Sequence, residues 1–457
     1  MSAEKLPEGW VETQLENIVD ILDSMRVPVN NSERQSRIAG KKENELYPYF
    51  GATGEVGKID DYIFDEELVA LGEDGVPFFD GHKNKAYMLY GKTWVNNHAH
   101  VIRAISGLSH NKYLCHYLNQ FDYHDYVNGG TRLKLTQANM RKLPVSLAPL
   151  AEQKIIAEKL DTLLAQVDST KARLEKIPQI LKRFRQAVLG AAMNGTLMGL
   201  KESSPHPLCK QWQWPEVPST WSVLTYSELV DSRLGKMLDK VKNIGSPIKY
   251  LGNVNVRWFS FNLENLQEIL ISESERSELI LKYGDILICE GGEPGRCAIW
   301  TESDKTPIVF QKALHRARVR EKIIPEWLVL NLKNDSNNLT LSQLFTGTTI
   351  KHLTGKALAK YPLRVPPVYE QREIVRRVEQ LFAYADAIEK QVNNALARVN
   401  NLTQSILAKA FRGELTAQWR AENPDLISGE NSAAALLEKI KAERAASGGK
   451  KASRKKS

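Results

Sequence analysis

The sequence predicts an α+β fold in which two β-rich domains are separated by two long helices. The helices are expected to form an antiparallel coiled coil with an internal pseudo-twofold. Three observations predict this fold: a block of sequence occurs twice, each copy carries a long heptad pattern, and a segment rich in short strands precedes each copy. The chain therefore contains one module twice.

The repeated block covers residues 129–197 and 347–415, which align without a gap at a constant offset of 218 residues. The alignment holds 18 identities in 69 positions, where ordinary composition gives roughly 4 by chance. A weaker match opens each half, at 7–10 and 218–221, while 11–128 and 222–346 show no comparable match. A period this long indicates a tandem duplication of a domain.

Each block predicts one long helix, because apolar residues recur at alternating steps of four and three, as in the seam of a coiled coil. The predicted seam comprises Ile156, Leu160, Leu163, Val167, Leu174, Ile374, Val378, Leu381, Ile388 and Val392. Gly195 and Gly413 are expected to end the helices, and Pro178 to kink or break the first one. The alternative is that each helix packs separately on its own domain, but two seams of identical register favour pairing.

The two unmatched segments predict short strands and hairpins, because β-prone runs alternate with Gly and Asp turns. Such runs occur near 47–54 and 63–75 in the first segment, and near 248–252 and 284–300 in the second. The two segments share this alternation of strand-like runs and turns, but their residues do not match.

Both segments end in a similar glycine loop with hydroxyls and a basic side chain, which suits contacts to DNA phosphates. The candidate residues are Gly130, Thr131, Arg132, Lys134, Thr348, Thr349 and Lys351. Tyr49, Asn253 and Arg257 are candidates to reach base edges. A tight turn with solvated charges, and ordinary core or surface positions, are the alternatives at these sites.

The net charge of +8 and the pI near 9.0 favour a polyanionic partner such as nucleic acid. Five of these charges lie in a tail that is predicted to be disordered, at Lys450, Lys451, Arg454, Lys455 and Lys456. Charge alone is therefore weak evidence. The four cysteines have no metal-binding spacing, the histidines complete no ligand set, and we expect no metal. Without an apolar membrane span or signal peptide, the chain is expected to be cytoplasmic.

The sequence lacks motifs for catalysis. It has no phosphate-binding loop, no Asn/Asp-Pro-Pro-aromatic motif of adenine methyltransferases, and no Ser-His-Asp pattern. We therefore predict no catalytic residues and no cofactor bound by this chain.

The segments Ala148-Pro149-Leu150-Ala151-Glu152-Gln153 and Val365-Pro366-Pro367-Val368-Tyr369-Glu370-Gln371 each open a predicted helix. With the order of variable segment and repeated helix, they resemble the DNA-specificity subunits of type I restriction–modification enzymes, of the enterobacterial K-type (family A). The resemblance covers essentially the whole chain. It divides the chain into target-recognition domain 1 (1–148), helical spacer 1 (149–197), a linker (198–217), target-recognition domain 2 (218–366), helical spacer 2 (367–415), and a C-terminal helical segment with a basic disordered tail (416–457).

The resemblance implies a non-catalytic subunit that binds double-stranded DNA, two modification subunits and two restriction subunits. Each domain would read one half of a split target, and the helices would set the gap. S-adenosylmethionine, ATP and Mg would belong to the partners, which methylate adenine, translocate DNA and cut it. Two alternatives remain open at this point: a stand-alone DNA-modifying enzyme with degenerate motifs, and a purely structural coiled-coil adaptor.

Overall fold

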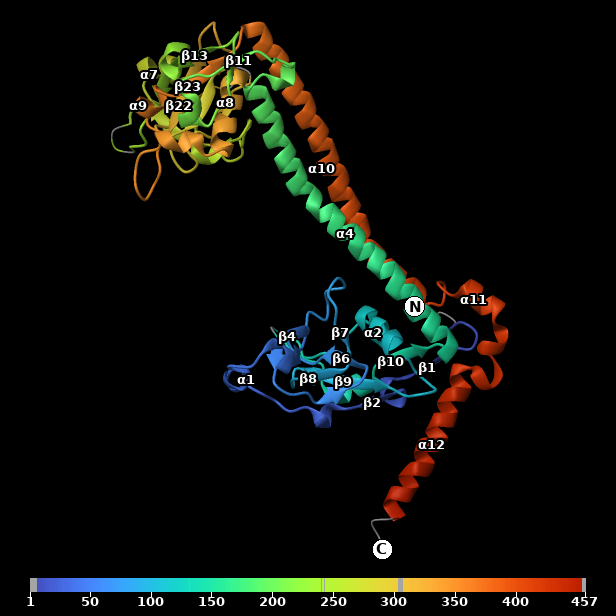
Figure 1. Cartoon of the computed structure of the whole chain (residues 1–457). Helices are drawn as coiled ribbons and strands as arrows, with labels where there is room; N and C mark the ends of the chain where they lie inside the picture. The colour runs from blue at the N-terminus through green and yellow to red at the C-terminus, as the bar shows by residue number, and fades with distance from the viewer. Residues whose placement is uncertain (1–5, 131, 240, 242, 303–306, 454–457) are drawn as a thin grey trace. The chain divides into compact units, whose positions relative to one another are not determined.

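The computed structural model describes residues 6–130, 132–239, 241, 243–302 and 307–453, with 447–453 as backbone only. The chain forms two compact units (Figure 1): unit 1 comprises Met1–Glu175 with Asn393–Ser457, and unit 2 comprises Lys176–Val392. The borders fall inside the two long helices, whereas the sequence analysis placed domain borders where those helices begin. Each unit contains one β-rich domain, called a head here, together with half of each helix.

The two long helices are α4 (Leu150–Met193) and α10 (Val368–Phe411), each 44 residues long. A kink or a break was expected at Pro178; the break is wrong, because α4 continues through this residue. Pro178 is exposed, so water can bond the carbonyl that loses its helical partner. Gly195 and Gly413 follow the helix ends with φ of 76° and 74°, the left-handed conformation that terminates helices.

The helices pair antiparallel within each unit. In unit 1 the start of α4 meets the end of α10: Leu160 and Leu407 share one core, and Lys159 Nζ donates to Leu415 O at 3.1 Å. In unit 2 Arg185, near the end of α4, donates to Asp386 on α10 at 2.6 Å. The alternative in which each helix packs only on its own head is therefore wrong.

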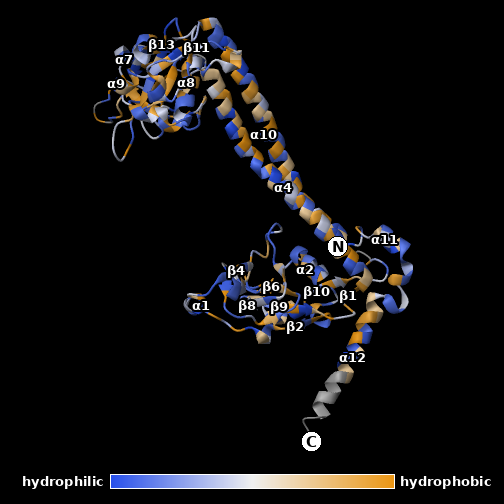
Figure 2. Cartoon of the chain, in the orientation of Figure 1, coloured by the Kyte–Doolittle hydropathy of each residue, from blue (hydrophilic) through white to orange (hydrophobic). Residues whose placement is uncertain are grey.

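All of the predicted seam positions are at least half-buried. Ile156, Leu160, Val167, Ile374, Val378 and Val392 are buried, and Leu163, Leu174, Leu381 and Ile388 are half-buried. Figure 2 shows apolar residues interspersed with hydrophilic ones along both helices, as an amphipathic pair requires.

The two heads have the same topology although their sequences do not align. One antiparallel sheet has the order β2-β9-β6-β7 in the first head and β14-β22-β19-β20 in the second. A second sheet has the order β4-β3-β8-β5 in the first head and β18-β15-β21 in the second, with β3·β8 and β15·β21 parallel in both.

The first head contains β1 Val11–Gln14, β2 Val19–Ile21, α1 Asn31–Ile38, β3 Tyr47–Gly51, β4 Gly54–Ile59, β5 Phe64–Asp65, β6 Leu68–Gly72, β7 Ala86–Leu89, β8 Lys92–Val95, β9 Ala99–Ala104, α2 Asn111–Gln120, α3 Gln137–Arg141 and β10 Pro144–Leu147. The linker contains β11 Ser203–Ser204, α5 Cys209–Trp212 and β12 Val217–Pro218. The second head contains β13 Ser222–Thr225, α6 Tyr226–Leu229, β14 Val230–Leu234, β15 Ser246–Leu251, β16 Val256–Arg257, β17 Ser260–Phe261, β18 Gln267–Ile271, α7 Glu273–Leu279, β19 Ile286–Cys289, β20 Cys297–Ile299, β21 Ile308–Phe310, β22 Leu314–Val319, α8 Pro325–Asn337, α9 Gly355–Leu358 and β23 Pro362–Val365.

Each head begins and ends in one two-stranded antiparallel ladder. β1 pairs with β10 in the first head, and β13 pairs with β23 in the second. The indole of Trp10 donates to Glu152 Oε2 at 2.8 Å, and that of Trp221 donates to Glu370 Oε2 at 2.9 Å. The weak match at the start of each half and the strong match near its end therefore form one frame, into which the rest of the head is inserted.

The C-terminal segment packs on the first copy of this frame. It contains α11 (Ala417–Glu422) and α12 (Ala433–Ser453). Buried Glu152 also accepts from Thr416 Oγ1 at 2.6 Å and from Arg420. The bounds of α12 include Lys450 and Lys451, so the predicted disorder is wrong for these two residues; Arg454, Lys455 and Lys456 lie outside the described residues. Among the helices described here, none is long and apolar enough to cross a membrane.

Candidate nucleic-acid interface

The two glycine loops, residues 128–134 and 346–352, are closed by the same backbone pairing. Asn128 N donates to Lys134 O at 3.0 Å and Lys134 N to Asn128 O at 2.8 Å; the pair Thr346 and His352 repeats this at 2.8 and 2.9 Å. We call these segments the shared loops. Their register makes His352 the counterpart of Lys134, so the two predicted lysines, Lys134 and Lys351, are not equivalent.

Residues that are identical in the two copies follow each shared loop and fix its position. Leu135 N donates to Glu73 O, and Leu353 N donates to Glu290 O, both at 2.7 Å. The hydroxyl of Thr136 caps α3, as its counterpart in the second copy caps α9. The capping bond explains why the threonine is identical in the two copies, and full burial of the side chain explains the leucine.

A buried histidine supports each of these leucines. The imidazole of His100 lies 2.8 Å from Leu135 O, and that of His315 lies 2.8 Å from Leu353 O. Both histidines are 1% exposed, so they are part of the support beneath the loops and do not reach solvent.

Two further turns lie beside each shared loop. In the first head Glu73 N donates to His98 O at 2.8 Å, and in the second Glu290 N donates to Ala313 O at 2.9 Å. We call the resulting surface the loop edge. It comprises residues 73–75, 96–98 and the shared loop in the first head, and 290–292, 311–313 and the shared loop in the second.

In the first head the basic side chains of the loop edge are held by carboxylates. Arg132 Nη2 lies 3.1 Å from Asp74 Oδ1, and Lys134 Nζ lies 3.2 Å from Glu73 Oε1. Their side chains remain 65% and 51% exposed. Both are therefore accessible to a phosphate, but a phosphate must compete with a carboxylate for each.

In the second head the loop edge has a different charge pattern. Lys351 Nζ donates only to Gly347 O, at 2.9 Å, among the described residues. Lys351, Thr348 and Thr349 are all exposed. A cation and two hydroxyls are thus free to contact a phosphate.

The second head also brings Asn253 to this edge. Its Nδ2 donates to Gly291 O at 3.2 Å, and its Oδ1 is buried without a hydrogen bond. Arg257 is exposed, and its Nη1 donates to Val254 O at 2.7 Å. Of the two base-edge candidates in this head, Asn253 is therefore joined to the loop edge, whereas the printed hydrogen bonds of Arg257 stay within its own turn.

The expectation for Tyr49 is wrong. Its side chain is 4% exposed, packs with Ile59 and Trp94, and donates its hydroxyl to Val29 O at 3.1 Å. The ring belongs to the core of the first head and cannot meet a base. Gly130 is exposed as the loop assignment requires, while Thr131 lies outside the described residues.

The sequence analysis missed several residues of this edge. Glu73 and Glu290 each follow a central strand, but their offset of 217 is one residue short of that of the repeated block, so an ungapped comparison does not align them. Gln311 carried no sequence signal, because its role depends on which loops the fold brings together.

Two features of the described residues bear on catalysis. They contain no group of three His, Cys, Asp or Glu side chains that could hold a metal ion. Burial raises the pKa of the Cys115 thiol to about 12 and that of Cys289 to about 11. These thiols stay protonated at neutral pH and are poor nucleophiles.

The sequence matches the family described as the type I restriction modification DNA specificity domain twice, at residues 7–179 and 218–398. The two matches correspond to the two copies of the module.

Relatives share this organisation. The chain is 40% identical to the EcoKI specificity subunit of Escherichia coli K12, over the full length of both chains. It is 51% identical to the EcoBI specificity subunit of Escherichia coli, with 70% of this chain and 69% of that one covered.

The fold is also known from solved structures. The specificity subunit HsdS from Thermoanaerobacter tengcongensis aligns with a TM-score of 0.57 at 18% identity, covering 90% of this chain and 99% of that one. The repeated module, the paired helices and the relatives lead to one assignment: the chain belongs to the family of type I restriction–modification DNA specificity subunits.

Proposed function

We propose that this chain is the DNA-recognition subunit of a type I restriction–modification complex, in which each head reads one half of a two-part target. The observation that carries this proposal is the contrast between frame and head. The ladder, the Trp–Glu hydrogen bond and the helix recur in both copies, whereas the loop edges have different side chains on the same topology. Two heads of this kind can present two different sets of side chains to DNA on the same scaffold.

The proposal divides the contacts with DNA into two kinds. The shared loops contact phosphates through Thr348, Thr349, Lys351, Arg132 and Lys134, and so position the head without reading sequence. The neighbouring turns of each loop edge then face the base edges, where differences between the heads determine the target.

Catalysis is assigned to partner subunits. Two modification subunits with S-adenosylmethionine, and two restriction subunits that use ATP and Mg, dock on the repeated frame, and the paired helices set the gap between the halves of the target. Two copies of one frame support this stoichiometry, because each copy offers a similar docking surface. The raised pKa of the buried Cys115 thiol supports this assignment, because a protonated thiol is a poor nucleophile.

Labelled S-adenosylmethionine distinguishes this proposal from a stand-alone DNA-modifying enzyme. The purified full-length chain is incubated with DNA, with and without the modification subunit of the same system. We expect methyl transfer only when both proteins are present, at adenines of one two-part sequence. Transfer by this chain alone would favour the stand-alone enzyme. Complexes that form without any sequence preference would favour the structural adaptor.

A further inference from the structure

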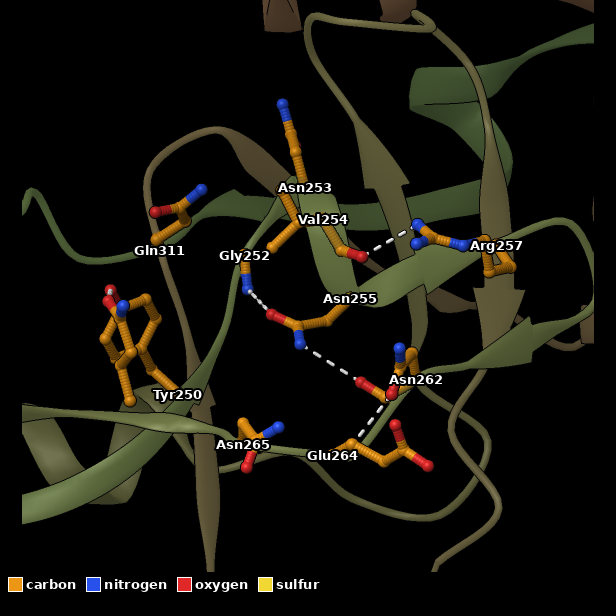
Figure 3. A pocket seen from close by; sticks show the side chains of 11 residues that line it. Tyr250, Gly252, Asn253, Val254, Asn255, Arg257, Asn262, Glu264, Asn265 and Gln311 are labelled. Carbon is orange, nitrogen blue, oxygen red and sulfur yellow. Dashed lines mark hydrogen bonds between the residues drawn. The ribbon is translucent and has the colours of Figure 1, made fainter. Parts of the chain in front are cut away.

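A pocket of about 470 Å³ opens on the second head, between the turn after β15 and the segment after β21 (Figure 3). Six of its eleven lining residues carry side-chain amides: Asn253, Asn255, Asn262, Asn265, Gln267 and Gln311. An amide presents one hydrogen-bond acceptor and two donor hydrogens. Which of these amides are free therefore determines what the pocket can bind.

Most of the amides are occupied within the head. Asn255 accepts from Gly252 N at 2.9 Å and donates to Asn262 O at 3.0 Å. Asn262 accepts from Glu264 N at 2.9 Å. Gln267 accepts from the hydroxyl of Tyr250 at 2.7 Å. These bonds hold the wall of the pocket in place.

Gln311 is different. Its side chain has no hydrogen-bond partner among the described residues, and Figure 3 draws no dashed line to it. The side chain of Asn265 is also unpaired among these residues, but Asn265 is exposed and does not belong to the loop edge. It lies over Gly252, where an added Cβ would stand 2.9 Å from Gln311 Nε2. The glycine therefore leaves the space that the free amide occupies.

The first head supplies an internal comparison. Gln311 N donates to Leu251 O at 3.0 Å, and Asn96 N donates to Phe50 O at 3.0 Å at the corresponding point after β8. The amide oxygen of Asn96 is occupied, because it accepts from His98 N at 2.8 Å. The same position thus carries a structural amide in one head and an unoccupied amide in the other.

Gln311 also lies on the loop edge. It belongs to the segment 311–313, whose last residue accepts from Glu290 N. Asn253, which also lines the pocket, donates to Gly291 O in the neighbouring turn. Exposed Lys312 follows Gln311 in the chain and adds positive charge where a phosphate would pass.

We propose that Gln311 is a base-reading residue of the second head, and that its amide recognises adenine in the half-site that this head contacts. The inference rests on the proposed function and deepens it. Adenine presents an acceptor, N7, beside a donor, the N6 amino group, in the major groove. A free amide matches this pair with two hydrogen bonds, whereas guanine offers two acceptors there and cytosine offers a donor.

The test uses the full chain assembled with its modification subunits, and selects bound duplexes from a randomised DNA library. Wild type is expected to enrich a two-part consensus. Gln311→Ala should reduce discrimination at one A·T pair of one half by about 5- to 150-fold. Gln311→Glu should prefer C·G at that position, because a carboxylate accepts from the cytosine amino group. The other half of the consensus is the internal control.

Two further variants distinguish a loss of base recognition from a loss of folding. Asn338→Ala removes an exposed amide of the second head that lies outside the pocket and the loop edge, and should leave the consensus unchanged. Gly252→Ala keeps Gln311 but displaces its amide, and should weaken discrimination at the same position as Gln311→Ala. Gly252 has a φ of −114°, which alanine adopts without strain.

The outcomes separate the two hypotheses. If wild type enriches a two-part consensus and Gln311→Ala enriches the same one with equal selectivity, the assignment of Gln311 is overturned. An equal loss at both halves, or a consensus altered as much by Asn338→Ala, also overturns it. If wild type itself enriches no consensus, the proposed function fails, whatever the variants do.

Discussion

At the scale of single residues, the frame depends on a carboxylate that both copies of the module contain. Glu152 is fully buried and bonds to Trp10, Thr416 and Arg420, whereas Glu370 bonds to Trp221 and to Tyr369. The Trp–Glu bond is common to both copies, but the arginine belongs only to the first. The C-terminal segment therefore stabilises one copy of the frame through a charge that the other copy lacks.

Replacing Arg420 tests this asymmetry. Arg420→Ala leaves the buried carboxylate of Glu152 without a counter-ion, and should lower the free energy of unfolding of unit 1 by about 3–5 kcal/mol. Denaturant titration with amide exchange at β1 and β10 measures this loss. In the double variant with Glu152→Gln the buried charge is gone, and much of the loss should be recovered. A double variant that is no more stable than Arg420→Ala would contradict this explanation.

A second residue-scale prediction concerns pH. Burial lowers the pKa of the His315 imidazole below its ordinary value, although the hydrogen bond to Leu353 O acts in the opposite direction. The folded chain thus binds fewer protons than the unfolded chain. The stability of unit 2 is full above about pH 6.5 and falls as the pH drops from there towards the lowered pKa.

His315→Gln removes this titration while keeping a donor for Leu353 O. Urea unfolding of unit 2 at pH 7.5 and at 5.5 should show a larger loss of stability for wild type than for the variant. Equal losses in the two proteins would show that His315 is not the titrating group.

At the scale of elements, the sequence predicted the repeated parts well. The 4–3 spacing located both long helices, and Gly195 and Gly413 end them as predicted. Short-range patterns suffice there, because a helix seam and a helix end are both local features. The rule that proline breaks a helix is a local one, and Pro178 shows its limit. This proline is exposed, and the helix continues through it because α4 is packed elsewhere along its length.

The heads were less predictable. β3 and β15 were expected as strands, and they are strands. The alternation of residues along a strand does not show which face is buried, so Tyr49 was expected on an accessible face although it is buried. The common topology of the heads could not be predicted from the sequence, because the corresponding strands share their order in the sheets and not their residues. Gln311 could not be selected either, since its environment comes from β15, β19 and β21 together.

The seam leads to a prediction about assembly. In the part of α4 that belongs to unit 1, Val167 is buried and Leu163 half-buried. Replacing both by Asp buries charges without partners, so the seam should open and the complex should dissociate into free subunits. Native mass measurement reads the outcome, and Thr162→Asp with Gln166→Asp, both on the exposed face, is the control. An intact complex in the seam variant would show that the seam does not organise the assembly.

The shared loops lead to a prediction about phosphate contacts. Lys351 has no carboxylate partner among the described residues, whereas Lys134 is paired with Glu73. Lys351→Ala should weaken binding equally on target and non-target DNA and reduce the salt slope by about 0.9. Lys134→Ala should have a smaller effect, because part of its charge is already neutralised. Anisotropy titrations over a range of salt concentrations measure both, and a loss confined to target DNA would make Lys351 a base reader.

At the scale of the whole molecule, one frame carries two heads of different specificity. Residues 15–143 lie between β1 and β10, and residues 226–361 lie between β13 and β23. Each insert begins and ends at adjacent strands of one ladder, so its replacement leaves the ladder and the Trp–Glu bond in place. The chain is thus divided into interchangeable recognition parts and a constant structural part.

This division predicts that specificity moves with the insert. Exchanging 15–143 for the corresponding segment of a related subunit should change one half of the target consensus and leave the other half and the gap intact, because the second head and the helices are untouched. Exchanging 226–361 should change only the other half. Adenine methylation mapped in cells that express each hybrid with its partner subunits gives both consensus sequences. The proposal that each head recognises one half of the target is wrong if either exchange alters both halves of the consensus, or if neither exchange alters either half.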